Sequence, residues 1–471
     1  MQQNSKIYEE YLPSSFRDPS GRIFKKNGRI YRNIHVSYKD NFDYLIKSKL
    51  YDQLVDKGWM VSHQEVAIPL SVSSQTLTYK TILPDMIQFI SYPYEWCFSQ
   101  QKDAAILTLE IQLLALKHKM MLKDASAFNI QFKDGRPVLI DTLSFEKIKD
   151  GEPWPAYQQF CKHFLAPLTL MSQIDSRINQ LSRNFIDGIP LDLASQLLPR
   201  TSWLRPAYLV HLHLHSWMQR KHSSTKNGGS QKQKKSVSVS ESGVRGLIES
   251  LLRSIKRIKC PREQTEWGDY YNDTNYSQRG LEHKVAIVDT LLDQVQPRNI
   301  WDLGANNGFF SRLGAKKNSH VIAMDGDHEA VEYNYLKVRE TKERNILPLV
   351  MDLTNPSGGI GFNNIERSAL FERGPTDLVI SLALVHHLAI SNNTPFELLS
   401  DFFAKCGRAL IIEFVPKDDS QVQRLLSSRK DIFSDYTQER FEQAFDKDYE
   451  FYDKIQIADS KRSIYLMRRK E

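Results

Sequence analysis

Two glycines frame a short turn in the C-terminal half of the chain, where a ligand could lie against the backbone. The segment Asn299–Ser311 is an apolar run that reaches Asp302 and then passes through Gly304 and Gly308. Glycine lacks a Cβ, so this turn can adopt left-handed backbone angles and admit a ligand close to the main chain. Amides at the start of a following helix carry partial positive charge and suit a ligand carboxylate. The pattern predicts a buried strand followed by a helix, beside a nucleoside-bearing ligand.

A dinucleotide could occupy the same kind of turn, but the spacing favours a ligand without a pyrophosphate. Dinucleotide loops read G-x-G-x-x-G, and their middle glycine lets the pyrophosphate touch the backbone. Here three residues separate Gly304 from Gly308, and Asn306 stands between them. Asparagine tolerates left-handed angles better than most residues, although it is bulkier than glycine.

Four more apolar runs follow the turn, and each could be a strand of the same sheet. The run His320–Asp325 ends in an acid, and a carboxylate at the tip of a second strand can accept hydrogen bonds from both ribose hydroxyls. A third run, Ile346–Asp352, also ends in an acid, and the last two are Thr376–Leu388 and Ala409–Phe414. One strand-end aspartate is usually a simple cap, but this spacing of several strand ends is not expected by chance.

On these residues, the C-terminal half resembles the class I S-adenosylmethionine (SAM)-dependent methyltransferases. Their first motif usually reads D/E-x-G-x-G-x-G, and this chain departs from it at Asn306. The resemblance begins near Lys284 and implies an α/β, Rossmann-like, seven-stranded methyltransferase domain, closed by antiparallel strands near residues 454–457 and 463–467. It also implies SAM as the cofactor. The residues expected to bind SAM lie in the turn and at the strand ends: Asp302, Gly304, Asn306, Gly308, Asp325, Asp352 and Ser381.

Two adjacent histidines after the fourth run are candidate proton acceptors. His386 and His387 would lie at the mouth of the expected cleft, and an unperturbed imidazole titrates near neutral pH. The alternative is a structural role, because a double histidine also occurs here in methyltransferases that do not obviously need a base. Glu413, at the tip of the fifth run, is a second candidate for contact with the acceptor. The aromatic segment Trp267–Tyr276 could cover the adenosyl group or could be an ordinary packed linker.

The N-terminal half contains an Asp-Asn-Asp series that resembles a kinase catalytic loop. Asp124, Asn129 and Asp141 follow the order D-x-x-x-x-N and strand-end Asp, which in kinases are a base and two metal ligands. No glycine-rich loop is recognisable, and Arg32 and Lys80 are the only candidates for the usual strand lysine. The alternatives are an active small-molecule kinase, a degenerate kinase-like domain that binds substrate, and a structural coincidence, since Asp and Asn also cap turns.

The whole chain, a kinase-like region followed by a methyltransferase, resembles NoeA-type nodulation-associated proteins. Its 471 residues are enough for two or three domains. We expect an α+β kinase-like or substrate-presenting region at 1–218, a basic flexible linker at 219–262 and the methyltransferase domain at 263–471. The linker is basic because no Asp or Glu occurs between Asp192 and Glu241, whereas this gap contains Arg220, Lys221, Lys226, Lys232, Lys234 and Lys235.

Composition sets further limits on location and partners. No apolar run approaches the roughly 20 residues that span a bilayer, and no signal-peptide core begins the chain, so we expect a cytoplasmic protein. The four cysteines contain no C-x-x-C pair, which argues against a zinc site, and no other metal site is expected apart from the speculative kinase-like one. The sequence leaves the oligomeric state open.

The expected function is transfer of a methyl group from SAM to an oxygen of a small molecule or saccharide intermediate, the acceptor being assigned by analogy alone. A nucleic-acid methyltransferase is the next alternative, because the net charge is +7 and the linker is basic. A bifunctional methyltransferase and small-molecule kinase, and a non-catalytic SAM-binding scaffold, are the other two.

Overall fold

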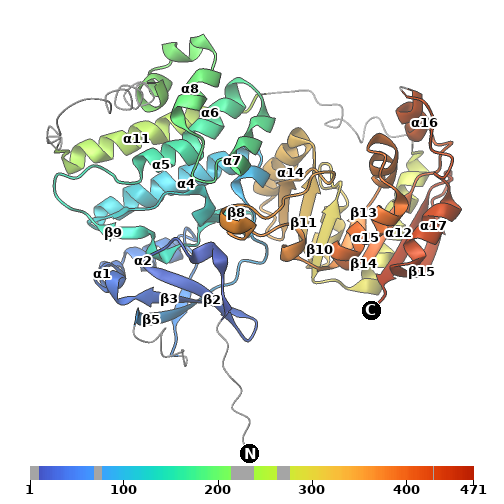
Figure 1. The fold of residues 1–471 in the computed structure, drawn as a ribbon, viewed down its shortest axis with the longest axis horizontal. Coiled ribbons are helices and arrows are strands. Elements are labelled where there is room, and N and C mark those ends of the chain that lie inside the picture. Colours follow the sequence, from blue (N-terminus) through green and yellow to red (C-terminus); the bar gives the residue numbers. More distant parts are fainter. Residues whose placement is uncertain (1–9, 68–76, 214–237, 262–275, 428) are drawn as a thin grey trace, which may run out of the picture. The chain divides into compact units, whose positions relative to one another are not determined.

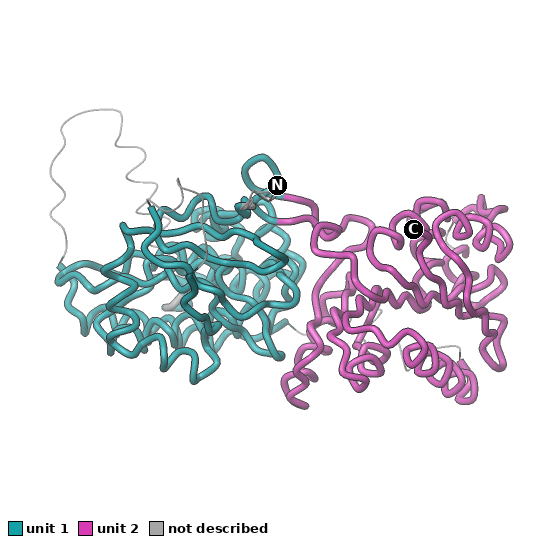
Figure 2. The backbone as a smooth tube through the Cα atoms, turned by 90° about the horizontal axis from the view of Figure 1, so that it is seen from below, with its two compact units in different colours: residues 1–261, 360–367 teal, residues 262–359, 368–471 magenta. Residues whose placement is uncertain are grey.

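The computed structural model describes residues 10–67, 77–213, 238–261, 276–427 and 429–471. The chain divides into two compact units, which Figure 2 shows in different colours. Unit 1 comprises residues 1–261 and 360–367, and unit 2 comprises residues 262–359 and 368–471. Among the described helices, none is long and apolar enough to cross a membrane.

Unit 1 opens with a five-stranded antiparallel sheet in the order β1-β2-β3-β5-β4. Its strands are β1 (Glu10–Tyr11), β2 (Gly21–Lys26), β3 (Arg29–His35), β4 (His63–Glu65) and β5 (Thr78–Pro84). Helices α1 (Lys39–Lys47) and α2 (Leu50–Asp56) lie between β3 and β4 in the chain. The helix α1 packs on the sheet because the buried Phe42 contacts Ile34 of β3 and Ile82 of β5 in one core cluster.

The rest of unit 1 is mainly helical and is built on α4 (Phe98–Lys117), which is buried over most of its length. The strands β6 (Met120–Leu122) and β9 (Phe145–Lys147) pair, and so do β7 (Ile130–Lys133) and β8 (Arg136–Leu139). Asp134 and Gly135 both have positive φ and form the tight turn between β7 and β8. Further helices are α5 (Tyr157–Phe160), α6 (Ala166–Gln173), α7 (Leu181–Asn184), α8 (Leu191–Leu197), α9 (Pro206–Tyr208) and α11 (Glu241–Arg257).

Helix α11 occupies part of the range 219–262, for which the sequence predicts a flexible linker. Its buried residues Val244, Ile248, Leu251 and Ile255 recur at helical spacing and form one apolar face. The helix packs along α4 (Figure 1). The most basic stretch of the predicted linker, residues 221–236, lies outside the described residues.

Unit 2 is a seven-stranded sheet in the order β12-β11-β10-β13-β14-β16-β15. Five strands are parallel, and β16 runs antiparallel between β14 and β15. The strands are β10 (Asn299–Leu303), β11 (His320–Asp325), β12 (Ile346–Val350), β13 (Thr376–Ser381), β14 (Gly407–Phe414), β15 (Tyr449–Gln456) and β16 (Ser463–Arg469). The five predicted apolar runs and the two predicted closing strands are all confirmed.

The two faces of this sheet are covered by different helices (Figure 1). Alternate residues of β14 show the division: Ala409 and Ile411 pack with the apolar side of α12, whereas Phe414 contacts the aromatic rings of Phe396 and Phe441 from α15 and α17. The helices are α12 (Gln278–Val295), α13 (Ser311–Lys316), α14 (His328–Thr341), α15 (Phe396–Cys406), α16 (Ser420–Ser427) and α17 (Gln438–Asp446). Parallel strands covered on both faces explain the continuous apolar runs in the sequence.

Candidate cofactor site

The glycine turn follows β10 at the point where the strand order reverses between β10 and β13. Gly304, Asn306 and Gly308 have φ values of +76°, +48° and +75°, so all three adopt left-handed conformations. The amides of Gly304 and Ala305 donate to the carbonyl of Met324, which ties the turn to β11. In parallel α/β sheets, ligands bind outside the carboxyl ends of the strands at such a reversal. The turn therefore has the position and the backbone conformation that the sequence predicts for a ligand site.

Asp302 lies in β10 beneath this turn and is buried, with 2% of its surface exposed. Its carboxylate accepts a hydrogen bond of 2.5 Å from the hydroxyl of Ser311. Burial raises the pKa of Asp302 to about 7, and the nearby charge of Asp325 adds to the shift, although the Ser311 hydrogen bond opposes it. The ionised form of the buried Asp302 carboxylate would therefore be stabilised by a cationic group bound beside it.

Asp325 ends β11 and points its carboxylate at the turn. One oxygen accepts from the amide of Asn306 at 2.7 Å, and the other accepts from the amide of Asp327 at 2.9 Å. Desolvation raises the pKa of Asp325 to about 6 against these hydrogen bonds. The Asp325 side chain is only partly buried, so its pKa is raised less than that of Asp302. Each carboxylate oxygen keeps a lone pair for a ligand hydroxyl.

The two other predicted cofactor residues lie after β12 and at the end of β13. Asp352 is exposed and caps the next turn, accepting from the amide and hydroxyl of Thr354 at 2.9 and 2.7 Å. Ser381 is fully buried, and its hydroxyl has no hydrogen-bond partner among the described residues. Because both strands are parallel to β10, these side chains lie at the same edge of the sheet as the glycine turn.

His386 and His387 follow β13, and their ring centroids lie 4.2 Å apart. His386 is 1% exposed, and its Nδ1 has no hydrogen-bond partner in the described part of the chain. Burial lowers the pKa of His386 well below its usual value, with further contributions from the charges of His387, Arg462 and Lys284. Burial, together with the charge of Arg462, lowers the pKa of His387 to about 4. Both rings are therefore neutral at pH 7, which differs from the near-neutral titration that the sequence predicts.

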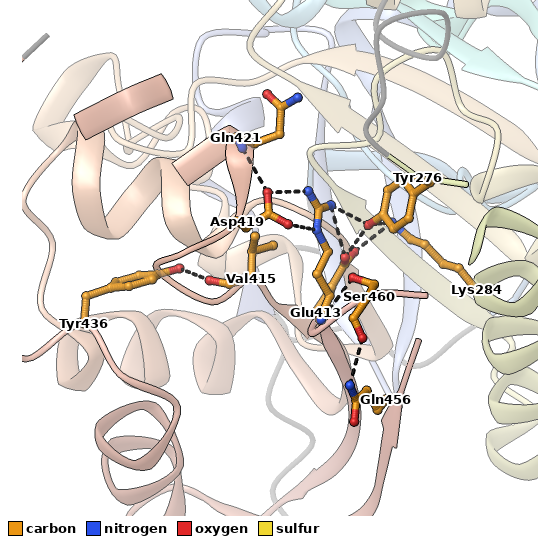
Figure 3. Close-up of polar contacts among 10 residues, drawn as sticks. Tyr276, Lys284, Glu413, Val415, Asp419, Gln421, Tyr436, Gln456 and Ser460 are labelled. Carbon is orange, nitrogen blue, oxygen red and sulfur yellow. Dashed lines mark hydrogen bonds and ion pairs between the residues drawn. The ribbon is translucent and has the colours of Figure 1, made fainter. Parts of the chain in front are cut away.

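Glu413, at the end of β14, is fully buried inside a polar network (Figure 3). One oxygen accepts from Lys284 Nζ at 2.7 Å. The other accepts from the hydroxyl of Tyr276 and from Arg462 Nη1, the latter at 3.5 Å. These cationic partners lower the pKa of Glu413 in spite of desolvation, the largest single influence on it. Glu413 is therefore an ionised acceptor whose two oxygens are already bound.

The same network extends from Arg462 to Asp419. Arg462 Nε and Nη2 donate to the two Asp419 oxygens at 2.8 and 2.9 Å, a bidentate geometry, and Arg462 Nη1 donates to the Tyr276 hydroxyl at 2.6 Å. The sequence draws no attention to Lys284 or Arg462 because neither belongs to a motif. Of the aromatic segment Trp267–Tyr276, only Tyr276 is among the described residues.

In unit 1 the structure brings Asp124, Asn129 and Asp141 together. Burial raises the pKa of Asp124, and the charge of Asp141 adds to this shift. A hydrogen bond from Asn129 opposes it. Asp141 accepts from Ser144 Oγ at 2.6 Å. Arg32 on β3 pairs with Asp141 at 2.7 Å and with Asp18 at 2.5 Å.

Of the two candidates for the strand cation of unit 1, only one lies at this cluster. Lys80 Nζ instead binds Glu65 at 2.8 Å across the β4–β5 pair. Arg32 is therefore the cation that accompanies the Asp-Asn-Asp series.

Five parallel strands closed by an antiparallel pair, with a glycine turn and acidic strand ends at the reversal, define a class I methyltransferase fold in unit 2. No protein-family model matches the chain. The chain nevertheless belongs to the family of nodulation protein NoeA: it is 32% identical to that protein of Rhizobium meliloti (strain 1021) over 465 residues, which cover 98% of this chain and 96% of the relative.

Some solved structures are similar over part of the chain. N-methyltransferase NodS from Bradyrhizobium japonicum WM9 is 12% identical, with 41% of this chain and 99% of that chain covered and a TM-score of 0.32. Magnesium protoporphyrin IX methyltransferase (ChlM) from Synechocystis PCC 6803 is 18% identical, with 43% and 93% covered and a TM-score of 0.31. WbdD is 18% identical, with 42% of each chain covered and a TM-score of 0.29. The strand order of unit 2, and not these low TM-scores, carries the assignment of the fold.

Proposed function

We propose that unit 2 binds SAM and transfers its methyl group to an oxygen of a small molecule or saccharide intermediate. The observation that carries this proposal is the left-handed glycine turn between two buried or half-buried carboxylates, Asp302 and Asp325, at the reversal of the strand order. Asp325 would accept hydrogen bonds from the ribose hydroxyls, and Asp302 would hold the ammonium of the methionyl group. Asp352 would lie near the adenine, and Ser381 offers a buried hydroxyl at the next strand end.

In this proposal the protein mainly aligns the two reactants and offers a neutral imidazole to the methyl acceptor. The sulfonium supplies the leaving group, so a nucleophile aligned with the methyl carbon and shielded from water would react without further activation of the donor. His386 or His387 would receive the proton of an acceptor hydroxyl, since both rings are neutral at pH 7. Glu413 would act indirectly, because its oxygens are bound to Lys284, Tyr276 and Arg462.

The decisive experiment combines binding with identification of the product. The purified chain should give saturable calorimetric binding of SAM or S-adenosylhomocysteine, and methyl-labelled SAM with a cell extract should yield a labelled product for mass spectrometry. Binding without turnover would indicate a non-catalytic scaffold, and salt-dependent labelling of RNA or DNA would indicate a nucleic-acid acceptor. Absence of any saturable binding or thermal shift would refute the proposal.

A second function is favoured by the cluster in unit 1, which we propose to be a kinase-related site. The order β1-β2-β3-β5-β4, a cation on β3 paired with Asp141, and the proximity of Asp124 and Asn129 support it. A magnesium-dependent affinity for ATP that Asp141→Ala abolishes would support nucleotide binding. Failure of the wild-type chain to bind ATP with magnesium would leave a substrate-presenting domain.

A further inference from the structure

We propose that Lys284 binds the methionyl carboxylate of the cofactor and so makes unit 2 selective for ligands that carry the complete amino acid group. This inference rests on the proposed SAM site and adds a residue to it. Its basis is an ammonium N–H of Lys284 that has no acceptor among the described residues, inside the buried network of Tyr276, Lys284, Glu413 and Arg462 (Figure 3).

The other network members are held by hydrogen bonds and ion pairs within the network or to Asp419. Both oxygens of Glu413 accept from cationic or phenolic donors. The hydroxyl of Tyr276 donates to Glu413 and accepts from Lys284 at 3.1 Å and from Arg462 at 2.6 Å. Arg462 also donates from Nε and Nη2 to Asp419.

Lys284 has a spare donor. An ammonium group carries three N–H bonds, and two of them are used on Glu413 and Tyr276. The third has no hydrogen-bond acceptor among the residues that the structure describes. Lys284 is 3% exposed, and placing a charge away from water costs several kcal/mol unless partners compensate. A buried ammonium with an unused N–H would gain from an additional anionic acceptor.

The position of the ammonium matches the methionyl end of the ligand. Lys284 Nζ lies 4.9 Å from the ring centroid of Phe310, which closely follows the glycine turn. Its charge also acts on Asp302 and on His386. The adenosine would extend toward Asp325 on β11, so the amino acid group would extend away from β11, toward Lys284 and His386. Asp302 would take the ammonium of that group and Lys284 the carboxylate.

The test compares three ligands that differ only in the amino acid group. S-adenosylhomocysteine carries it in full, its decarboxylated analogue S-adenosyl-3-thiopropylamine lacks the carboxylate, and 5′-methylthioadenosine lacks the entire group. We expect the wild-type chain to bind S-adenosylhomocysteine on the order of 10- to 100-fold more tightly than the decarboxylated analogue, as charge-assisted hydrogen bonds allow. In Lys284→Met, which keeps the apolar stem, this ratio should fall to about 1 while the affinity for 5′-methylthioadenosine stays unchanged.

Each outcome bears on one claim. An unchanged ratio in Lys284→Met, or a wild-type ratio near 1, would overturn the role of Lys284. A uniform loss of affinity for all three ligands would assign Lys284 a structural role and also overturn the proposal. If Lys284→Met does not fold, Lys284→Arg should preserve a ratio above 1 and Lys284→Gln should reduce it. If the wild-type chain binds none of the three ligands, the SAM site itself is refuted.

Discussion

The pKa of Asp302 predicts that the cofactor binds with release of a proton near neutral pH. Burial raises this pKa to about 7, so the carboxyl is about half protonated at pH 7 in the empty site. Only the ionised form can hold the ligand ammonium, so binding should displace about half a proton from Asp302 at pH 7. Asp325, with a pKa of about 6, adds about a tenth of a proton if ribose binding requires its ionised form. Release should fall to about a tenth at pH 8 and approach zero at pH 9.

Isothermal titration calorimetry with S-adenosylhomocysteine measures this quantity directly. The apparent enthalpy in phosphate and in Tris buffer at one pH differs by the released protons multiplied by the difference in buffer ionisation enthalpy. Affinity should also weaken as the pH falls below 7, approaching tenfold per pH unit. In Asp302→Asn, which keeps a hydrogen-bond acceptor for Ser311, most of the release at pH 7 should disappear. Equal enthalpies in the two buffers at pH 7 would refute the argument from burial.

Three further predictions concern the turn, the ribose carboxylate and the histidines. Asp325→Ala should weaken SAM binding by about 1.5–3 kcal/mol, and an unchanged calorimetric dissociation constant would remove Asp325 from the ribose role. Because the pKa of His387 is about 4, the pH–rate profile should lack a limb near 6.5 from this residue, and His387→Ala should lower turnover more than cofactor affinity. Gly308→Ala should destabilise the chain by about 1–3 kcal/mol in urea unfolding, because φ is +75° and a Cβ would lie 2.4 Å from a neighbouring asparagine side chain. The control is Gly246→Ala in α11, where nothing lies within 4 Å, which should be neutral or stabilising.

Much of unit 2 could be predicted from the sequence because its information is local. Parallel strands covered on both faces appear as uninterrupted apolar runs, and the acids that end them mark the carboxyl edge of the sheet. The glycine turn could also be predicted, because Asn306 adopts the left-handed conformation that asparagine tolerates. Helix α11 could have been predicted as well, because Val244, Ile248, Leu251 and Ile255 follow a helical period. The basic composition upstream of it favoured a linker instead.

The polar network could not be predicted, because its members come from distant parts of the chain. Tyr276 and Arg462 are 186 residues apart, yet their side chains are 2.6 Å apart at the bonded atoms. Glu413 carried a recognisable pattern as a strand-end acid, and Tyr276 belonged to the aromatic segment Trp267–Tyr276. Lys284 and Arg462 had no motif, so the sequence favoured a free acceptor-binding carboxylate where the structure has a bound one. The low pKa of the histidines was hidden for the same reason, since it depends on burial and on Arg462.

The charges around the site are arranged in a way that suits a cationic ligand. A sulfonium bound near His386 would be repelled by an imidazolium, but burial together with the nearby cations keeps both histidines neutral at pH 7. Each of those cations has an anionic partner, Lys284 in Glu413 and Arg462 in Asp419. At Asp302 the pKa is raised, mainly by burial and further by the charge of Asp325. If unit 2 holds SAM, the ligand supplies a positive charge beside Asp302, and the neutral rings do not repel the bound sulfonium. The proton of the acceptor would pass to a ring only as methyl transfer turns the sulfonium into a neutral thioether.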